Sequence, residues 1–205
     1  MGTMMPKPEP ILAEQLKGYT LILASGSPRR KMLLEQMNIP FTVQEVDVEE
    51  VFPPDLNGPD IPEYLARLKA GAAMGRLGEK DILLTADTIV WHEQQLLGKP
   101  ADKSDAKAML RRLSGGWHEV ITAVCTTTTA KQLCVTETTW VKFRELKEAE
   151  LNYYVDTYRP FDKAGAYGIQ EWIGLVGIEE IQGSYLNVVG LPTHRVCELL
   201  SAMVR

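Results

Sequence analysis

Residues 21–37, LILASGSPRRKMLLEQM, join two patterns that predict different structures. The apolar run 21–24 is typical of a buried strand, and the apolar side chains of 31–37 recur at helical spacing. Between the two runs, Ser27 is a natural N-cap and Pro28 suits the first helical position. The stretch therefore predicts a strand that leads through a short loop into a helix.

Arg29 and Arg30 stand at the start of this helix, where the helix dipole already carries positive partial charge. Each guanidinium there costs about 0.3–1 kcal/mol. The free N–H groups of such a loop attract phosphate, and arginine binds phosphate with two parallel hydrogen bonds. The pair therefore indicates a phosphate site, with a solvated basic helix start as the alternative. The site is neither a Walker loop, because no GK[ST] follows, nor a nucleophile elbow, because GxSxG is absent.

The composition of the chain narrows its class. The 205 residues are 45% hydrophobic and 24% charged, which suits a globular protein with a substantial core. The net charge of −5 argues against broad nucleic-acid binding, and no apolar run approaches the roughly 20 residues of a membrane span. Three cysteines without a CxxC pair predict free thiols in a reducing compartment, and the scattered histidines lack metal-ligand spacing. We therefore expect a cytoplasmic protein without nucleic-acid or membrane partners.

Outward from the first stretch, strand and helix patterns are mixed. The expected strands are 41–46, 82–86, two short strands within 89–100, and two long runs, 118–129 and 132–146, whose Thr and Val content fits an antiparallel pair. The expected helices are 62–77, 104–113, 147–158 and 191–204. This order predicts an α/β fold with two lobes, in which 1–18 is a flexible leader and 19–205 a single domain.

Helical spacing also predicts caps and buried faces. In 62–77, Ala72 is expected on the inward face. In 104–113, Ser104 is the expected N-cap and Ala108 is expected to face inward.

Asp87 follows the apolar run 82–86, so we expect the end of a strand to deliver this carboxylate to a cleft. A carboxylate at the end of a buried strand is costly unless it is paired, hydrated or bound to metal. In a phosphate site it would hold Mg²⁺ or orient an attacking water, and the alternative is a simple turn cap. Lys69 and Lys99 resemble ordinary surface lysines when taken alone, and they gain interest only beside such a site.

Residues 162–170, DKAGAYGIQ, combine small side chains with a terminal amide. Gly165 and Gly168 permit a close approach of the backbone to a flat ligand or to another strand. Gln170 both donates and accepts hydrogen bonds, which suits the edge of a base. The alternative is a tight helix-to-strand connection.

Together, seven stretches resemble the signature blocks of the Maf family of nucleotide pyrophosphatases. They are LILASGSPRR, LARLKA, TADTIV, GKP, LSG with a following His, DKAGAYGIQ and GSYLNVVGLP, in the family's order from residue 21 to about residue 192. The resemblance implies an α/β fold of the Maf/ITPase type, with a mixed twisted sheet flanked by helices and a deep substrate cleft between two lobes. It also implies hydrolysis of a nucleoside triphosphate to the monophosphate and pyrophosphate with a divalent metal cation, Mg²⁺ or Mn²⁺.

The family's site residues carry over to this chain by motif position. Asp87 is implied as the catalytic base. Glu50, at the end of VDVEE, is implied as a metal ligand together with Asp87. The implied ligands of the triphosphate are Ser25, Arg29, Arg30, Lys69 and Lys99.

Three positions bear on the choice of substrate. The branch that acts on dTTP and UTP carries Arg, Thr and Gln where this chain has Arg29, Thr88 and Gln170, whereas the branch resembling 7-methyl-GTP pyrophosphatases has Glu in place of that Gln. An amide such as Gln170 accepts from N3–H of uracil or thymine and donates to a neighbouring carbonyl. We therefore expect a pyrophosphatase of dTTP, UTP and modified pyrimidine triphosphates, with a homodimer left open. The alternative is a non-catalytic nucleotide-binding regulator of cell division or septum formation.

Overall fold

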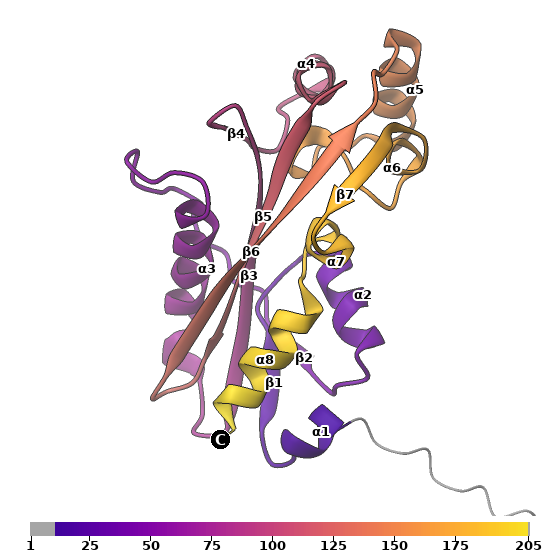
Figure 1. Ribbon diagram of the computed structural model, residues 1–205. Coiled ribbons are helices and arrows are strands. Elements are labelled where there is room, and N and C mark those ends of the chain that lie inside the picture. The colour runs from indigo at the N-terminus through magenta and orange to yellow at the C-terminus, as the bar shows by residue number, and fades with distance from the viewer. Residues whose placement is uncertain (1–10, 205) are drawn as a thin grey trace, which may run out of the picture.

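A mixed β-sheet forms the centre of the fold, which the computed structural model describes for residues 11–204 (Figure 1). Its strands are β1 (Thr20–Leu23), β2 (Thr42–Val43), β3 (Asp81–His92), β4 (Gln95–Leu97), β5 (Trp117–Thr127), β6 (Gln132–Phe143) and β7 (Ile178–Gln182). The order across the sheet is β2-β1-β3-β5-β6-β7, with β4 paired to β3. β1 runs parallel to β2 and β3, and the other pairs are antiparallel, as expected for the two long threonine-rich strands.

Helices cover both faces of this sheet. They are α1 (Ile11–Gln15), α2 (Pro28–Gln36), α3 (Asp60–Ala73), α4 (Lys103–Leu113), α5 (Glu148–Tyr158), α6 (Trp172–Gly177), α7 (Tyr185–Val189) and α8 (Thr193–Met203), with short 3-10 turns at Met74–Arg76 and Ala164–Ala166. α3 packs on β3 and β5, whereas α7 and α8 contact β5 and β6 from the opposite face (Figure 1).

The long strands β3, β5 and β6 connect two lobes (Figure 1). One lobe contains β1, β2, α2, α3 and α8, and the other contains β4, β7, α4, α5 and α6. The predicted α/β fold with a mixed sheet and two lobes is therefore confirmed.

The stretch 21–37 folds as predicted. Leu23 and Leu34 are fully buried in the main core, where each contributes about 1.5–3 kcal/mol relative to an exposed position. Ser27 is the N-cap of α2, since its hydroxyl accepts from the Arg30 backbone N–H at 3.5 Å, and a proline opens the first turn. The sequence of β1 and α2 thus specifies both elements and the loop between them.

The edge of β3 that faces β1 is only partly covered. β1 pairs with residues 81–84 of β3, and β4 pairs with residues 90–92. Among the described strands, none pairs with residues 85–89 on this edge. We call this open segment the notch, and it decides where the functional site lies.

The expectation that a strand ends before Asp87 is wrong, because β3 continues to His92. On its other edge β3 pairs with β5 over residues 83–91, so hydrogen-bond partners continue past the polar residues. The carboxylate reaches a cleft because the notch opens beside the strand, whereas a strand end was expected to place it there. The expected strand 41–46 is also shorter and pairs only at Thr42 and Val43.

Two details of the expected helices are corrected. Asp102, and not Ser104, is the N-cap of α4, since its carboxylate accepts from the Asp105 backbone N–H at 2.9 Å. Ala108 is exposed, because the buried face of α4 runs through positions 106, 110 and 113. Ala72 is likewise exposed on α3, whose buried face includes positions 66, 70 and 73.

The cysteine prediction is wrong for two of the three residues. Cys125 and Cys134 form a disulfide bond across β5 and β6. The hairpin register pairs these positions directly, which a separation of nine residues along the chain does not reveal. Cys197 is a free, half-buried thiol.

The ends and the surface add little to the site. Residues 1–10 of the predicted leader lie outside the described residues, while 11–15 form α1 and Leu16 is buried against the core.

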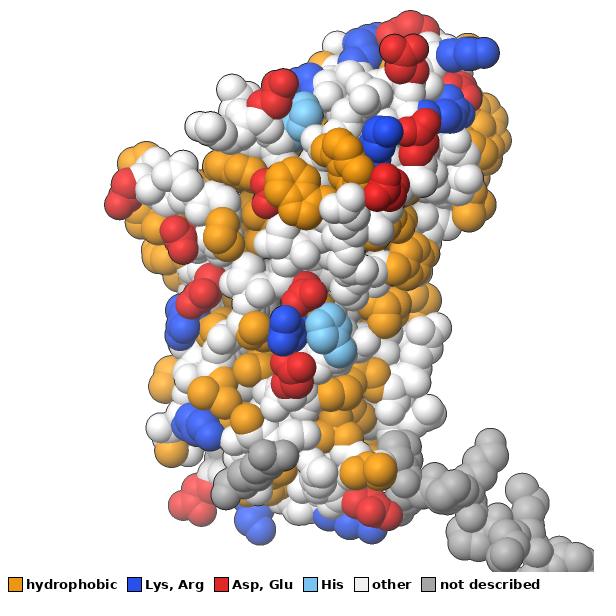
Figure 2. Space-filling model, in the orientation of Figure 1, with side chains coloured by type: hydrophobic (Ala, Val, Ile, Leu, Met, Phe, Trp, Pro, Cys, Tyr) orange, Lys and Arg blue, Asp and Glu red, His pale blue; other side chains and the backbone are white. Residues whose placement is uncertain are grey.

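Acidic and basic side chains alternate over the face in Figure 2, in keeping with the small net charge. Within residues 11–204, no helix combines the length and the apolar character needed to cross a membrane.

Candidate active site

A cavity of about 570 Å³ opens at the notch, where the two lobes meet. Positions within the segments 24–30, 46–52, 65–69, 87–90, 96–99, 162–170 and 188–190 line it. All the site residues expected from the sequence are among them: Ser25, Arg29, Arg30, Glu50, Lys69, Asp87, Thr88, Lys99 and Gln170. Segments far apart along the chain are therefore brought into one cleft.

The cavity receives side chains from both faces of β3. Successive residues of a strand point to opposite faces. Thr85 and Asp87 face α3, where the Thr85 hydroxyl donates to the Ala66 carbonyl at 2.8 Å. Thr88 faces the other side, where it meets Arg30. Because the notch leaves this edge of β3 open, both faces reach the same space.

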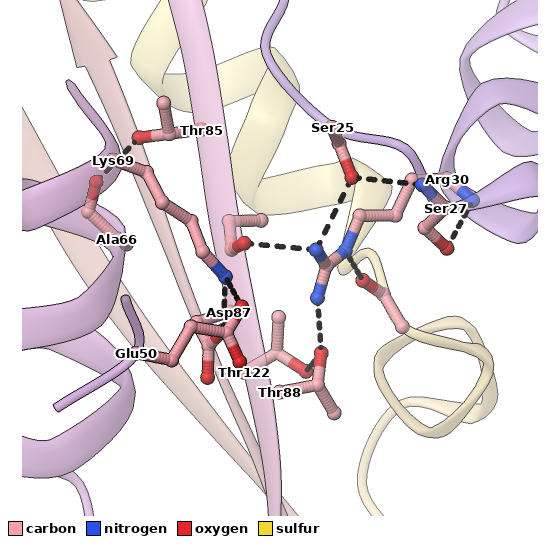
Figure 3. Close-up of polar contacts among 12 residues, drawn as sticks. Ser25, Ser27, Arg30, Glu50, Ala66, Lys69, Thr85, Asp87, Thr88 and Thr122 are labelled. Carbon is pink, nitrogen blue, oxygen red and sulfur yellow. Dashed lines mark hydrogen bonds and ion pairs between the residues drawn. The ribbon is translucent and has the colours of Figure 1, made fainter. Parts of the chain in front are cut away.

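On the α3 side, one lysine bridges two carboxylates (Figure 3). The Lys69 ammonium lies 2.5 Å from Asp87 Oδ1 and 2.8 Å from Glu50 Oε1. Lys99 Nζ lies 3.9 Å from the other oxygen of Glu50 and remains mostly exposed. Lys69 reaches the cavity because its position on α3 lies beside the buried alanines of the helix face.

The two carboxylates differ in their proton affinity. Burial raises the pKa of Asp87, although the charges of Lys69 and Arg30 oppose the shift. Burial also acts to raise the pKa of Glu50, but its hydrogen bond to Lys69 and the nearby cations, Lys99 among them, bring it below its usual range. Carboxylates whose environments separate their pKa values commonly divide the roles of base and charged ligand.

Arg30 fills the notch from the opposite side (Figure 3). Its Nη1 donates to the Ala86 carbonyl at 2.8 Å and to Ser25 Oγ at 3.4 Å, and its Nε donates to the Gly190 carbonyl at 2.9 Å. Its Nη2 donates to Thr88 Oγ1 at 2.9 Å. A guanidinium has five N–H donors, and these four bonds leave a single N–H for a ligand. Arg30 therefore holds the notch together, and its expected contact with a phosphate stays a prediction.

Arg29 is less constrained than its neighbour. Its Nε donates to the Val189 carbonyl at 3.2 Å, and its Nη1 lies 3.4 Å from the exposed carboxylate of Asp162. Ser25 Oγ accepts from the Ser27 backbone N–H at 3.2 Å, which shapes the loop before α2.

The segment 162–170 closes the cavity on the side of the second lobe. Gly165 has φ of 67°, and its N–H donates to the Gly98 carbonyl. A Cβ at this position would lie 2.9 Å from a methyl group of Val90, so the close approach to a strand expected here occurs. Gln170 is exposed at the cavity wall.

Two buried side chains at this segment, Lys163 and Tyr154, make contacts that were not expected from the sequence. Lys163 lies 2.7 Å from Asp162 and 3.2 Å from Glu171. Tyr154 donates to Glu171 and accepts from the Gly168 backbone N–H at 3.0 Å. These residues hold the backbone on both sides of Gln170, and only their three-dimensional neighbours reveal it.

Thr122 and Asn187 were also missed. Thr122 is the cross-strand neighbour of Thr88, with hydroxyl oxygens 3.0 Å apart. The Asn187 amide donates to the carbonyls of Val120 and Glu137, which fixes α7 against the sheet. The block GSYLNVVGLP marked the region, but its pattern does not indicate which side chain anchors it.

Metal-binding capacity at the site rests on two carboxylates. Within the described part of the chain, no group of three or more His, Cys, Asp or Glu side chains lies close enough to hold a metal ion. Glu50 and Asp87 share one ammonium group, so a positive charge fits between them.

The fold and the cavity define an α/β protein with a cleft at the open edge of its sheet, where cations and paired carboxylates meet. The family model described as "Maf-like protein" matches residues 20–203. A relative from Flavobacterium johnsoniae, named dTTP/UTP pyrophosphatase, is 46% identical over 194 residues, which is 95% of this chain and 100% of the relative. A relative of the same name from Bacteroides fragilis is 51% identical over 182 residues, or 88% of this chain and 94% of the relative. The chain belongs to the Maf family.

Among solved structures, the chain matches the Ham1 protein of Staphylococcus aureus. It aligns with a TM-score of 0.45 and 16% sequence identity, over 60% of this chain and 71% of that chain.

Proposed function

We propose that this protein hydrolyses dTTP and UTP, and modified pyrimidine triphosphates of the same hydrogen-bonding pattern, to the monophosphate and pyrophosphate. The observation that carries the reaction type is Asp87, a buried carboxylate with a raised pKa in a cavity lined by cations. The choice of substrate is supported by relatives named dTTP/UTP pyrophosphatase that align with nearly the whole chain.

Asp87 is the proposed general base. A base works best when its pKa approaches the working pH, and burial moves Asp87 in that direction. Asp87 takes a proton from water, the water oxygen forms a bond to the α-phosphorus, and the bond from that phosphorus to pyrophosphate breaks. Glu50 stays ionised beside it, because its pKa is lowered.

The cations at the cavity mouth are proposed to bind the triphosphate. Lys69 and Lys99 lie beside the carboxylates, and Arg29 lines the same cavity. Together they would offset the charge of the phosphoryl oxygens, which is the main demand of phosphoryl transfer. Ser25 and the last free N–H of Arg30 complete this set.

A divalent cation, Mg²⁺ or Mn²⁺, fits the same place. Mg²⁺ commonly takes one or two protein carboxylates and completes its shell with water and substrate phosphates. Glu50 and Asp87 would hold it, consistent with the ammonium group that already lies between them. When bound, the cation supplies stabilisation of charge on the phosphoryl oxygens.

The test of this proposal is release of pyrophosphate from dTTP, UTP, CTP and 7-methyl-GTP. We expect dTTP and UTP to be preferred, and Asp87→Asn to lower their turnover by about 10²–10⁴-fold because an amide takes no proton. Glu119→Gln is the matched control, since Glu119 is another strand carboxylate with a burial-raised pKa that does not line the cavity.

Two outcomes would contradict the proposal. Binding of dTTP without turnover would favour a nucleotide-binding regulator. Equal turnover by Asp87→Asn and Glu119→Gln would remove Asp87 from the reaction.

A further inference from the structure

A chain of hydrogen bonds runs from the cavity wall into the core behind it. Arg30 Nη2 donates to Thr88 Oγ1 at 2.9 Å, Thr88 Oγ1 lies 3.0 Å from Thr122 Oγ1, and Thr122 Oγ1 donates to the Asn187 backbone carbonyl at 3.3 Å. The first two side chains line the cavity, whereas Thr122 and Asn187 are fully buried. The chain therefore connects a ligand-facing hydroxyl to groups that no ligand touches.

The donors and acceptors at its two ends give this chain a direction. A guanidinium only donates, so the Thr88 oxygen accepts from Arg30. A carbonyl only accepts, so the single proton of Thr122 points to Asn187. The bond between the two threonines is then donated by Thr88. The Thr88 hydroxyl donates its only proton to Thr122 and accepts from Arg30 with one lone pair. Its second lone pair remains available to a ligand in the cavity.

Both ends of the chain are held by the fold. Arg30 is fixed by the carbonyls of Ala86 and Gly190. The Asn187 side chain donates to Val120 O at 2.9 Å and to Glu137 O at 3.2 Å, which keeps its own carbonyl in place. Burial of the inner members prevents exchange with solvent, so the orientation of the Thr88 proton is set by the protein.

We infer that Thr122, acting with the Asn187 carbonyl, makes Thr88 an obligate acceptor and thereby selects bases with an N3–H group against cytosine. This inference rests on the proposed function. The inference gives the N3–H contact, expected from the sequence for Gln170, to Thr88, and leaves Gln170 to the neighbouring exocyclic group; both side chains line the cavity. In that arrangement uracil and thymine would donate from N3 to Thr88, whereas cytosine would present a lone pair to the lone pair of Thr88. The amide of Gln170 can flip and exchange its donor and acceptor, so it can bind either base. Discrimination between the bases therefore requires a group whose role as donor or acceptor is fixed. Thr122 is a positioning residue, since it acts only through Thr88.

The test compares UTP with CTP in variants of the buried threonine. Thr122→Val keeps the shape of the side chain and removes the acceptor of the Thr88 proton, which is then free to donate to cytosine N3. We expect the ratio of kcat/KM for CTP to that for UTP to rise by about tenfold, mainly through KM for CTP. Thr122→Ser retains the hydroxyl and should restore the ratio. In a protein that already carries Thr88→Val, adding Thr122→Val should not change the ratio of kcat/KM for CTP to that for UTP any further.

Thr126→Val is the matched control. Thr126 lies on the same strand and face as Thr122 and is equally buried, but its hydroxyl has no hydrogen-bond partner among the described residues. A ratio for Thr122→Val that equals that of Thr126→Val would overturn the inference, because both would then report only a lost hydroxyl in the core.

Nucleotide binding needs no turnover, so measurements of Kd distinguish a failure of this inference from a failure of the proposed function. Absence of pyrophosphate release from dTTP and UTP by the wild-type protein would defeat the proposed function alone. The ratio of the Kd values for CMP and UMP still reports the preference of the site. A fall in that ratio for Thr122→Val, with restoration by Thr122→Ser, supports the inference, and an unchanged ratio rejects it.

Discussion

Arg29 and Arg30 are neighbours at the start of one helix, yet they have different hydrogen-bond partners and therefore different roles. Arg30 makes four hydrogen bonds across the notch, three of them to Ala86, Gly190 and Thr88. Arg29 makes one bond to a carbonyl and one to an exposed carboxylate. The unfavourable dipole contact is therefore offset for Arg30 by the fold itself, and for Arg29 by the proposed phosphate.

Alanine substitutions separate these two roles. Arg30→Ala leaves several acceptors of the notch without a partner and should lower the free energy of unfolding by about 2–4 kcal/mol. Arg29→Ala should change it by less than about 1 kcal/mol while raising KM for dTTP. Urea unfolding and steady-state kinetics on both variants provide the measurement. Equal destabilisation by the two changes would show that this division is wrong.

At the scale of single residues, the sequence predicted the roles that depend only on neighbouring positions in the chain. Ser27 caps the helix as its residue type and position suggest. The sequence did not reveal the role of Arg30 in holding the notch together, because three of its four partners lie 56 to 160 positions away along the chain. Glu50 was placed by motif position, and the structure brings it to Lys69.

At the scale of elements, β3 decides the site because its two edges are covered unequally. The composition of 82–86 predicted a strand, and this was confirmed, but the polar pair after it suggested an end that does not occur. Polar residues within a central strand are tolerated here because the notch gives them a cavity to face. Strand pairing is a long-range property, so neither the notch nor the Cys125–Cys134 bond follows from local patterns.

His118 links β5 to the segment that carries Gln170. Its Nε2 lies 2.7 Å from the Tyr167 hydroxyl, and its ring stacks on Phe143. Burial, assisted by the charge of His92, lowers its pKa from 6.5 to about 3. The folded protein therefore keeps this imidazole neutral over most of the acidic range.

This shift predicts a loss of stability on acidification. Between pH 6.5 and pH 3 the unfolded chain binds a proton at this histidine and the folded chain does not, so stability falls as the pH falls. From pH 7 to pH 5 His118 should contribute a loss of about 2 kcal/mol. His118→Phe retains the ring stacking and should show a correspondingly smaller loss in urea unfolding at the two pH values.

His194→Gln serves as the control, because the side chain of His194 is about half exposed. This variant keeps His118, so it should retain the loss that His118 contributes between pH 7 and pH 5. An equal loss in all three proteins would show that His118 is not the group responsible.

At the scale of the molecule, the two lobes meet at a cavity, and both faces of β3 contribute side chains to its lining. Asp87 enters it from the side of α3, and Thr88 enters it from the side of α2. The roles proposed for Asp87 in the reaction and for Thr88 in base selection thus fall on adjacent residues of one strand. The signature blocks predicted which residues gather, and the structure adds how one strand divides them between two faces.

We propose that water, deprotonated by Asp87, attacks the α-phosphorus of the triphosphate. The direct measurement is hydrolysis of dTTP in water enriched with oxygen-18, with the products analysed by mass spectrometry. We expect one labelled oxygen in dTMP and none in pyrophosphate, since the new bond forms at the α-phosphorus. Label found in pyrophosphate, or release of dTDP and phosphate, would contradict it.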